Sequence, residues 1–268
     1  GRMPVDNIQS DFLSQDNFRL SWERILRSQH AENKDRIALR VFSSGITQNI
    51  EQIIQEIKTN TYQPSSAYKI YMPKVARTLR TLPVLTVRDR LVYQAIGNLI
   101  IREAAPNLSV VANRNVFAHL PQPHSSLFTL LPWKKQFRLF TQNYEKIWTN
   151  ENRWVVEADI SSFYASIDHN LLISLVEERW IADREFLDLL RKCLWTWTAH
   201  ERGPNISRGI PQGYETSDLL ATLFLLPVDE RLVQNYRYLR YVDDIRILTT
   251  DRDTASKALV KLDLELQS

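Results

Sequence analysis

YRYLRYVDDIRILTT, the sequence of residues 236–250, predicts a β-hairpin with two adjacent carboxylates at its turn. Two runs rich in aromatic and β-branched residues, 236–240 and 245–250, flank the tetrapeptide Tyr241–Asp244. The side chains of Asp243 and Asp244 repel each other on a tight turn unless a cation neutralises them. Aspartate is common in turns, however, so this pair taken alone indicates no more than an ordinary turn.

A third carboxylate follows another candidate strand. The sequence VVEADI at 155–160 predicts a short buried strand that brings Asp159 to its end, where a lone carboxylate is costly unless it is paired or bound to a metal. If the strands are neighbours, Asp159 and Asp243 face each other although 84 positions separate them (243 − 159). Three carboxylates at one sheet edge, in a chain with a single cysteine, predict an oxygen-ligand site for Mg²⁺. Two such ions about 3.5–4 Å apart would suit an in-line displacement by a 3′-hydroxyl with pyrophosphate as leaving group.

Charge is distributed unevenly along the 268 residues. Residues 1–150 contain 20 Lys and Arg against 11 Asp and Glu, whereas residues 151–268 contain 14 against 20. The excess is strongest in 61–140, with 11 basic and 2 acidic residues. Such a stretch could bind nucleic acid by counterion release, although a solvated basic surface is an equally good interpretation. The longest apolar run, 219–228, is far short of the roughly 20 residues that cross a bilayer. We therefore expect no membrane partner and a cytoplasmic location.

The remaining segments predict an α+β fold with two domains, 1–150 and 151–268. In the first, we expect a β-ribbon at 66–85 and a helix capped by Thr86, with Arg88, Asp89 and Arg90 as a capping and salt-bridge cluster. In the second, Asp168 and His169 are expected to cap and pack a helix, and the element order β-α-α-β-β-α suits a ferredoxin-like antiparallel sheet backed by helices. Residues 107–123 are expected to be irregular. The expected helices are 17–31, 46–59, 168–180, 183–198, one that follows the loop 202–213 and runs to about 234, and 252–266.

Four motifs resemble those of reverse transcriptases, in the order and with the approximate spacing of that family. They are TLRTLPVLTVRDRLVYQAI at 78–96, ADISSFYASIDHNLL at 158–172, RGIPQGYETSDLLATLFL at 208–225 and YVDD at 241–244. The resemblance is nearest to the prokaryotic branch, which includes group II intron, retron and antiviral defence enzymes. It implies a right-hand polymerase with mainly helical fingers at 1–150 and a palm at 151–268. Only 24 residues follow Asp244 (268 − 244), so the thumb is expected to be absent, which favours a fragment of fingers and palm.

The resemblance also implies roles for single residues. Asp159, Asp243 and Asp244 would hold two Mg²⁺ ions (Mn²⁺ is an alternative), and the backbone carbonyl of Ile160 would complete one coordination shell. The residues that match the family's nucleotide pocket are Lys74, Arg80, Phe163, Tyr164, Gln212 and Gly213. Of these, Tyr164 or Phe163 would be the steric gate.

The implied activity is RNA-directed DNA synthesis from an RNA template, a DNA or RNA primer and dNTPs. Three alternatives stay open: protein-primed or untemplated DNA synthesis of a phage-defence type, RNA-templated RNA synthesis, and a catalytically silent RNA-binding scaffold. The aromatic residue at position 164 argues against RNA synthesis. Retention of all three carboxylates argues against the scaffold. The sequence leaves the oligomeric state open.

Overall fold

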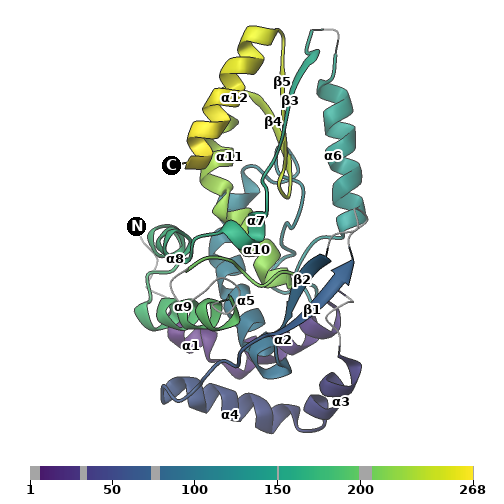
Figure 1. The fold of residues 1–268 in the computed structure, drawn as a ribbon. Helices are drawn as coiled ribbons and strands as arrows, with labels where there is room; N and C mark the ends of the chain where they lie inside the picture. The colour runs from purple at the N-terminus through teal and green to yellow at the C-terminus, as the bar shows by residue number, and fades with distance from the viewer. Residues whose placement is uncertain (1–6, 31–34, 74–78, 150, 199–206, 268) are drawn as a thin grey trace. The chain divides into compact units, whose positions relative to one another are not determined.

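A computed structural model describes residues 7–30, 35–73, 79–149, 151–198 and 207–267 (Figure 1). The chain divides into two compact units that interleave along the sequence. The first unit comprises Gly1–Glu103, Pro123–Thr129 and Tyr164–Leu220, and the second comprises Ala104–Gln122, Leu130–Phe163 and Ala221–Ser268. The assignment of fingers to 1–150 and palm to 151–268 stays a prediction about roles.

Helix α5, Val87–Ser109, is buried along most of its length, and its residues up to Glu103 belong to the first unit. Its apolar side chains point in all directions, as expected of a helix that other elements surround, and they include Leu91, Val92, Ala95, Ile96, Leu99 and Ile100. The other helices of this unit are α1 (Ile8–Phe12), α2 (Gln15–Leu26), α3 (Arg36–Ser44), α4 (Ile46–Lys58), α8 (His169–Arg179) and α9 (Arg184–Thr198). The short helix α7 (Phe163–Ser166) precedes α8, and α10 (Glu215–Phe224) comes after α9 in the sequence.

The predicted β-ribbon is confirmed. Strand β1, Tyr68–Pro73, pairs antiparallel with β2, Leu79–Val84, in a register that sets Tyr68 opposite Val84. At the base of the ribbon, the hydroxyl of Tyr214 accepts a hydrogen bond from the backbone N–H of Leu85 (2.8 Å) and donates one to the carbonyl of Pro83 (3.2 Å). The ribbon is thereby fixed at its base to the segment that follows Gly213.

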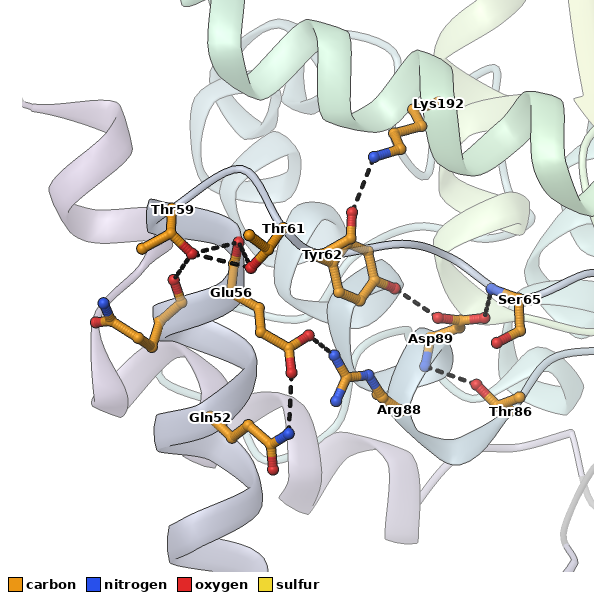
Figure 2. Close-up of polar contacts among 11 residues, drawn as sticks. Gln52, Glu56, Thr59, Thr61, Tyr62, Ser65, Thr86, Arg88, Asp89 and Lys192 are labelled. Carbon is orange, nitrogen blue, oxygen red and sulfur yellow. Dashed lines mark hydrogen bonds and ion pairs between the residues drawn. The ribbon is translucent and has the colours of Figure 1, made fainter.

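The predicted capping and salt-bridge cluster at the start of α5 is confirmed for Arg88 and Asp89 (Figure 2). The backbone N–H of Asp89 donates to the Thr86 hydroxyl (3.1 Å), and the Asp89 carboxylate accepts a hydrogen bond from the buried hydroxyl of Tyr62 (2.5 Å). Arg88 forms an ion pair with Glu56 of α4. These contacts attach the segment between α4 and β1 to the first turn of α5.

The second unit contains a three-stranded antiparallel sheet in the order β3–β5–β4. Strand β3 is Trp154–Asp159, and the predicted hairpin is confirmed as β4, Arg237–Tyr241, and β5, Asp244–Thr249. Helix α12 (Arg252–Gln267) packs on β3 and β5, and α6 (Trp133–Ile147) packs on β4, on the other side of the sheet in Figure 1. Helix α11 (Leu226–Leu232) precedes β4. A core cluster joins α6 to the sheet: Phe117, Phe140, Leu239 and Leu248.

Some sequence-based predictions were wrong in detail. The helix expected to run to about 234 is two helices, because Pro227 lacks a backbone N–H and stands at the start of α11. Strand β3 is only half buried, with Val156 as its one buried residue, rather than a buried strand. The predicted helix 17–31 ends at Leu26, and α1, α3 and α6 were not expected. None of the helices in the described part of the chain combines the length and apolar composition that crossing a membrane requires.

Candidate active site

The turn between β4 and β5 places a β-branched residue in the left-handed region of backbone space. Tyr241 pairs with Asp244, so Val242 and Asp243 form a two-residue loop. Val242 has φ +58°, a conformation that costs a residue with a branched side chain about 1–3 kcal/mol. Such strain persists only where surrounding contacts fix the backbone.

A buried arginine supplies such contacts. The guanidinium of Arg240 donates to both carboxylate oxygens of Asp229 (2.8 and 2.6 Å), to the carbonyl of Val242 (2.8 Å) and to that of Thr222 (3.2 Å). Both charged side chains are fully buried, and the hydroxyl of Tyr238 donates to Asp229 as well (2.6 Å). Burial opposes the charge, yet the Asp229 carboxylate raises the pKa of Arg240 above its ordinary value. The carbonyl before Asp243 is thus tied to the core.

The three predicted carboxylates lie at this end of the sheet. Asp159 on β3 is directly opposite Asp244 on β5, so their side chains leave the sheet on the same face. The expected pairing of Asp159 with Asp243 is therefore wrong by one residue. Asp159 is exposed, which removes the expected burial penalty on its charge. Asp243 is half-buried in the loop, and its pKa is raised, chiefly by burial and also by the charges of Asp159 and Asp244. A hydrogen bond from backbone N–H and, to a smaller extent, His119 act in the opposite direction.

Arg246 partly compensates this negative charge. Arg246 follows Asp244 by two positions on β5. Its guanidinium donates two hydrogen bonds to the Asp244 carboxylate (Nη2–Oδ2 3.0 Å and Nε–Oδ1 3.3 Å). It also lies over the rings of Phe140 (5.1 Å) and Tyr144 (4.7 Å) on α6. The described segments contain no ready-made group of three His, Cys, Asp or Glu side chains around a metal position. The convergence of all three carboxylates on one ion therefore stays a prediction.

The side chain of Tyr164, one of the two candidate gate residues, forms a hydrogen bond within the first unit. Its buried hydroxyl donates to Oδ1 of Asp218 on α10 (2.6 Å), and Oδ2 of Asp218 contacts Nε2 of His30 (2.6 Å). These three residues belong to the first unit. The ring of Tyr164 is held by its backbone at one end and by the hydrogen bond to Asp218 at the other. Phe163, the alternative gate, is buried in the second unit.

The segment that contains Gln212 and Gly213 lies along the start of α8 within the first unit. The N–H of Gly209 donates to the carbonyl of Ile167 (2.8 Å), and that of Ile210 donates to the carbonyl of Tyr164 (2.9 Å). His169 contacts the Gly209 carbonyl through Nε2 (2.6 Å), and Asp168 caps α8, so the packing and capping roles expected of both are confirmed.

Of the two residues predicted to contact the nucleotide in this segment, Gly213 has φ +97°, which favours glycine, and Gln212 is half-buried.

The side chains of the two residues predicted to contact the triphosphate are not described. Lys74 lies outside the described residues, and Arg80 is described only by its backbone, which pairs with Met72 in the ribbon. Ile160 directly follows β3 in the second unit. The residues that sequence reasoning missed are Arg240, Asp229, Arg246, Asp218 and His30. Only Arg246 had a clear signal, because residues two apart on a strand share a face with each other.

Comparison with known proteins identifies the family of this chain. A sequence model of the family described as reverse transcriptase (RNA-dependent DNA polymerase) matches residues 72–268, which is most of the chain. The chain belongs to the reverse transcriptase family. The resemblance that the four motifs indicated is thereby confirmed.

Several curated relatives of this reverse transcriptase family member are intron-encoded proteins. The group II intron-encoded protein LtrA of Lactococcus lactis subsp. cremoris is 28% identical over 193 residues, which cover 70% of this chain and 28% of LtrA. Protein YkfC of Escherichia coli is 25% identical over 217 residues, or 78% of this chain and 52% of YkfC. The putative COX1/OXI3 intron 2 protein of Saccharomyces cerevisiae is 25% identical over 70% of this chain and 20% of its own length. The chain thus spans a fifth to a half of these relatives.

A solved structure supports the fold of the family. Telomerase from Candida albicans, in complex with a fragment of telomeric RNA, matches with a TM-score of 0.51 and 11% sequence identity, over 79% of this chain and 41% of that one. Together with the family match, this likeness supports the predicted right-hand polymerase fold, built here from helices and small antiparallel sheets. The ferredoxin-like palm and the absence of a thumb stay predictions.

Proposed function

We propose that this chain contains the catalytic centre of an RNA-directed DNA polymerase that adds deoxynucleotides to a primer 3′-hydroxyl. The observation that supports the proposal is the arrangement of three carboxylates at one end of the second unit's sheet. Asp159 and Asp244 are direct cross-strand partners, and Asp243 is in the two-residue loop beside them. Their sequence context is that of the family motifs, and the family match includes all three.

The charge distribution at this site suits divalent cations. Burial raises the pKa of Asp243, and the charges of Asp159 and Asp244 raise it further, so a cation bound beside the three carboxylates would offset their repulsion. Carboxylate oxygens are ligands that Mg²⁺ and Mn²⁺ accept. Asp159, Asp243 and Asp244, with the backbone carbonyl of Ile160, would hold two such ions. When bound, the ions would activate the primer hydroxyl and stabilise the pyrophosphate that leaves.

The sugar of the incoming nucleotide would be selected by the ring of Tyr164. A hydrogen bond of 2.6 Å between its hydroxyl and the buried side chain of Asp218 limits rotation of the ring. A fixed aromatic ring under the sugar would leave no room for a 2′-hydroxyl, which favours dNTPs. Gln212 and Gly213 would line the nucleotide and template pocket, and positive φ at Gly213 permits a close backbone approach. Lys74 and Arg80 would bind the triphosphate as a point charge and as a fork.

Primer extension tests the proposal. The assay uses poly(rA)/oligo(dT) with Mg²⁺, with dTTP compared with UTP and with reactions that lack template. The proposal predicts extension with dTTP on the primed template, far weaker extension with UTP and none without template. Synthesis of DNA without template would instead favour the untemplated class of enzyme, and extension with UTP at the rate of dTTP would contradict the gate. A chain that binds RNA but extends no primer would be a scaffold.

A further inference from the structure

An exposed surface at the start of α6 combines aromatic and basic side chains next to the catalytic hairpin. We define this aromatic–basic surface as Trp133, Lys134, Lys135, Phe137 and Arg138, and all five residues are exposed. Trp133 and Phe137 are 56% and 50% exposed, large fractions for apolar side chains of this size. Because they are four positions apart on a helix, the two rings lie on the same side of α6.

The charge of this surface is of one sign. The first ten residues of α6, WKKQFRLFTQ, contain three cations and no acidic residue, and its first acidic residue is Glu145. The ammonium group of Lys134 lies 5.7 Å from the centre of the Trp133 ring, so a cation and an aromatic face are presented together. Within the described residues no ion pair is found to Lys135 or Arg138. A surface that carries only positive charge complements a polyanion.

Contacts within the second unit place this surface beside the catalytic turn. The Phe137 ring packs edge-on against the ring of Tyr241, with centroids 5.2 Å apart. The Tyr241 hydroxyl donates to the backbone carbonyl of Trp133 (3.4 Å). Tyr241 immediately precedes the loop that contains Asp243. A ligand on the surface is therefore adjacent to the carboxylates where a primer end would react.

We propose that the aromatic–basic surface binds unpaired nucleotides of the template or primer strand close to the reacting end. Bases would stack on Trp133 and Phe137, and Lys134, Lys135 and Arg138 would contact the phosphates between them. Exposed aromatic rings interleaved with cations are the means by which proteins hold single strands without sequence preference. This inference rests on the proposed function for the identity of the strand, and it has a binding test that is independent of catalysis.

The first test measures binding of a fluorescein-labelled single-stranded oligonucleotide by anisotropy over a range of salt concentrations. Lys135→Gln/Arg138→Gln removes two exposed cations from α6, and Arg252→Gln/Lys257→Gln, the matched control, removes two from the exposed face of α12. Loss of two phosphate contacts lowers the slope of log K against log salt by about 1.4. Trp133→Ala/Phe137→Ala weakens binding about fivefold or more, the effect of losing one stacked base. The control pair leaves both quantities at the wild-type value.

A second measurement avoids any effect of substitution on folding. Primer–template duplexes with 4-thiouridine in the unpaired template, or 4-thiothymidine at the primer end, are cross-linked to the wild-type chain by light and mapped by mass spectrometry. Cross-links within 133–138 support the proposal, and the labelled strand identifies which source binds. Cross-links confined to other segments, or α6 variants that bind as the control does, would overturn it. Wild-type primer extension in the same preparation shows whether the proposed function stands, whichever way the surface behaves.

Discussion

Replacing Asp229 by alanine should cost this protein a large share of its stability. The Asp229 carboxylate is fully buried and contacts the guanidinium of Arg240 at 2.6 and 2.8 Å. Without it, a cation is left in the core with only neutral partners, among them the carbonyls of Val242 and Thr222 and the side chain of Tyr238. Breaking a buried ion pair in this way costs about 3–5 kcal/mol. The hydroxyl of Tyr238 also loses its acceptor, at a cost of about 1–3 kcal/mol. We therefore expect the free energy of unfolding to fall by at least about 3 kcal/mol. This is about a third of the roughly 10 kcal/mol by which a typical domain is stable.

Urea denaturation followed by circular dichroism measures this loss. Asp263→Ala is the matched control, because it removes a carboxylate of α12 that is exposed and accepts a hydrogen bond from Gln267. The control should change the free energy of unfolding by no more than about 0.5 kcal/mol. A loss below about 1 kcal/mol for Asp229→Ala, the range of an exposed pair, would refute the argument that this ion pair supports the hairpin.

Three further predictions concern the first unit. Gly97→Ala places a methyl group 2.5 Å from the hydroxyl oxygen of buried Thr216 and should destabilise the chain by about 1–3 kcal/mol in the same urea assay; a neutral effect would show that α10 can shift. Burial lowers the pKa of His169 below 6.5, so the unfolded chain binds its proton more tightly and stability should fall as pH drops below about 6.5; His169→Gln should flatten this part of the pH profile, and an unchanged profile would argue against it. Tyr164→Ala should raise incorporation of UTP relative to dTTP more than Tyr164→Phe, which keeps the ring and loses only the bond to Asp218; wild-type discrimination in Tyr164→Ala would exclude Tyr164 as the gate.

The β4–β5 hairpin could be predicted from sequence because its signals are local. Alternation of aromatic and β-branched residues fixed both strands, and Asp243 and Asp244 marked the turn between them. The pairing of Asp159 was missed by one residue, because the register between distant strands depends on the whole sheet and not on either strand alone.

Other features depend on tertiary contacts that a linear pattern does not encode. Arg240 alternates with Leu239 as a polar residue should on a half-exposed strand, yet it is fully buried because Asp229 on α11 supplies its counter-charge. Helix α6 had a detectable signal, with apolar residues at 133, 137, 140, 144 and 147, but its exposed aromatic residues resemble a core face. The link from Tyr164 to His30 through Asp218 joins positions up to 188 residues apart, and no local pattern indicates it.

The measurement that tests the central claim most directly is primer extension on poly(rA)/oligo(dT) by Asp243→Asn beside Asp253→Asn. Both substitutions remove one negative charge from the second unit, but Asp253 is exposed in the first turn of α12, away from the β4–β5 loop in sequence. If Asp159, Asp243 and Asp244 form the catalytic centre, Asp243→Asn abolishes extension while Asp253→Asn retains the wild-type rate, and both variants unfold cooperatively. Extension by Asp243→Asn at the wild-type rate would contradict the assignment of the active site to this hairpin.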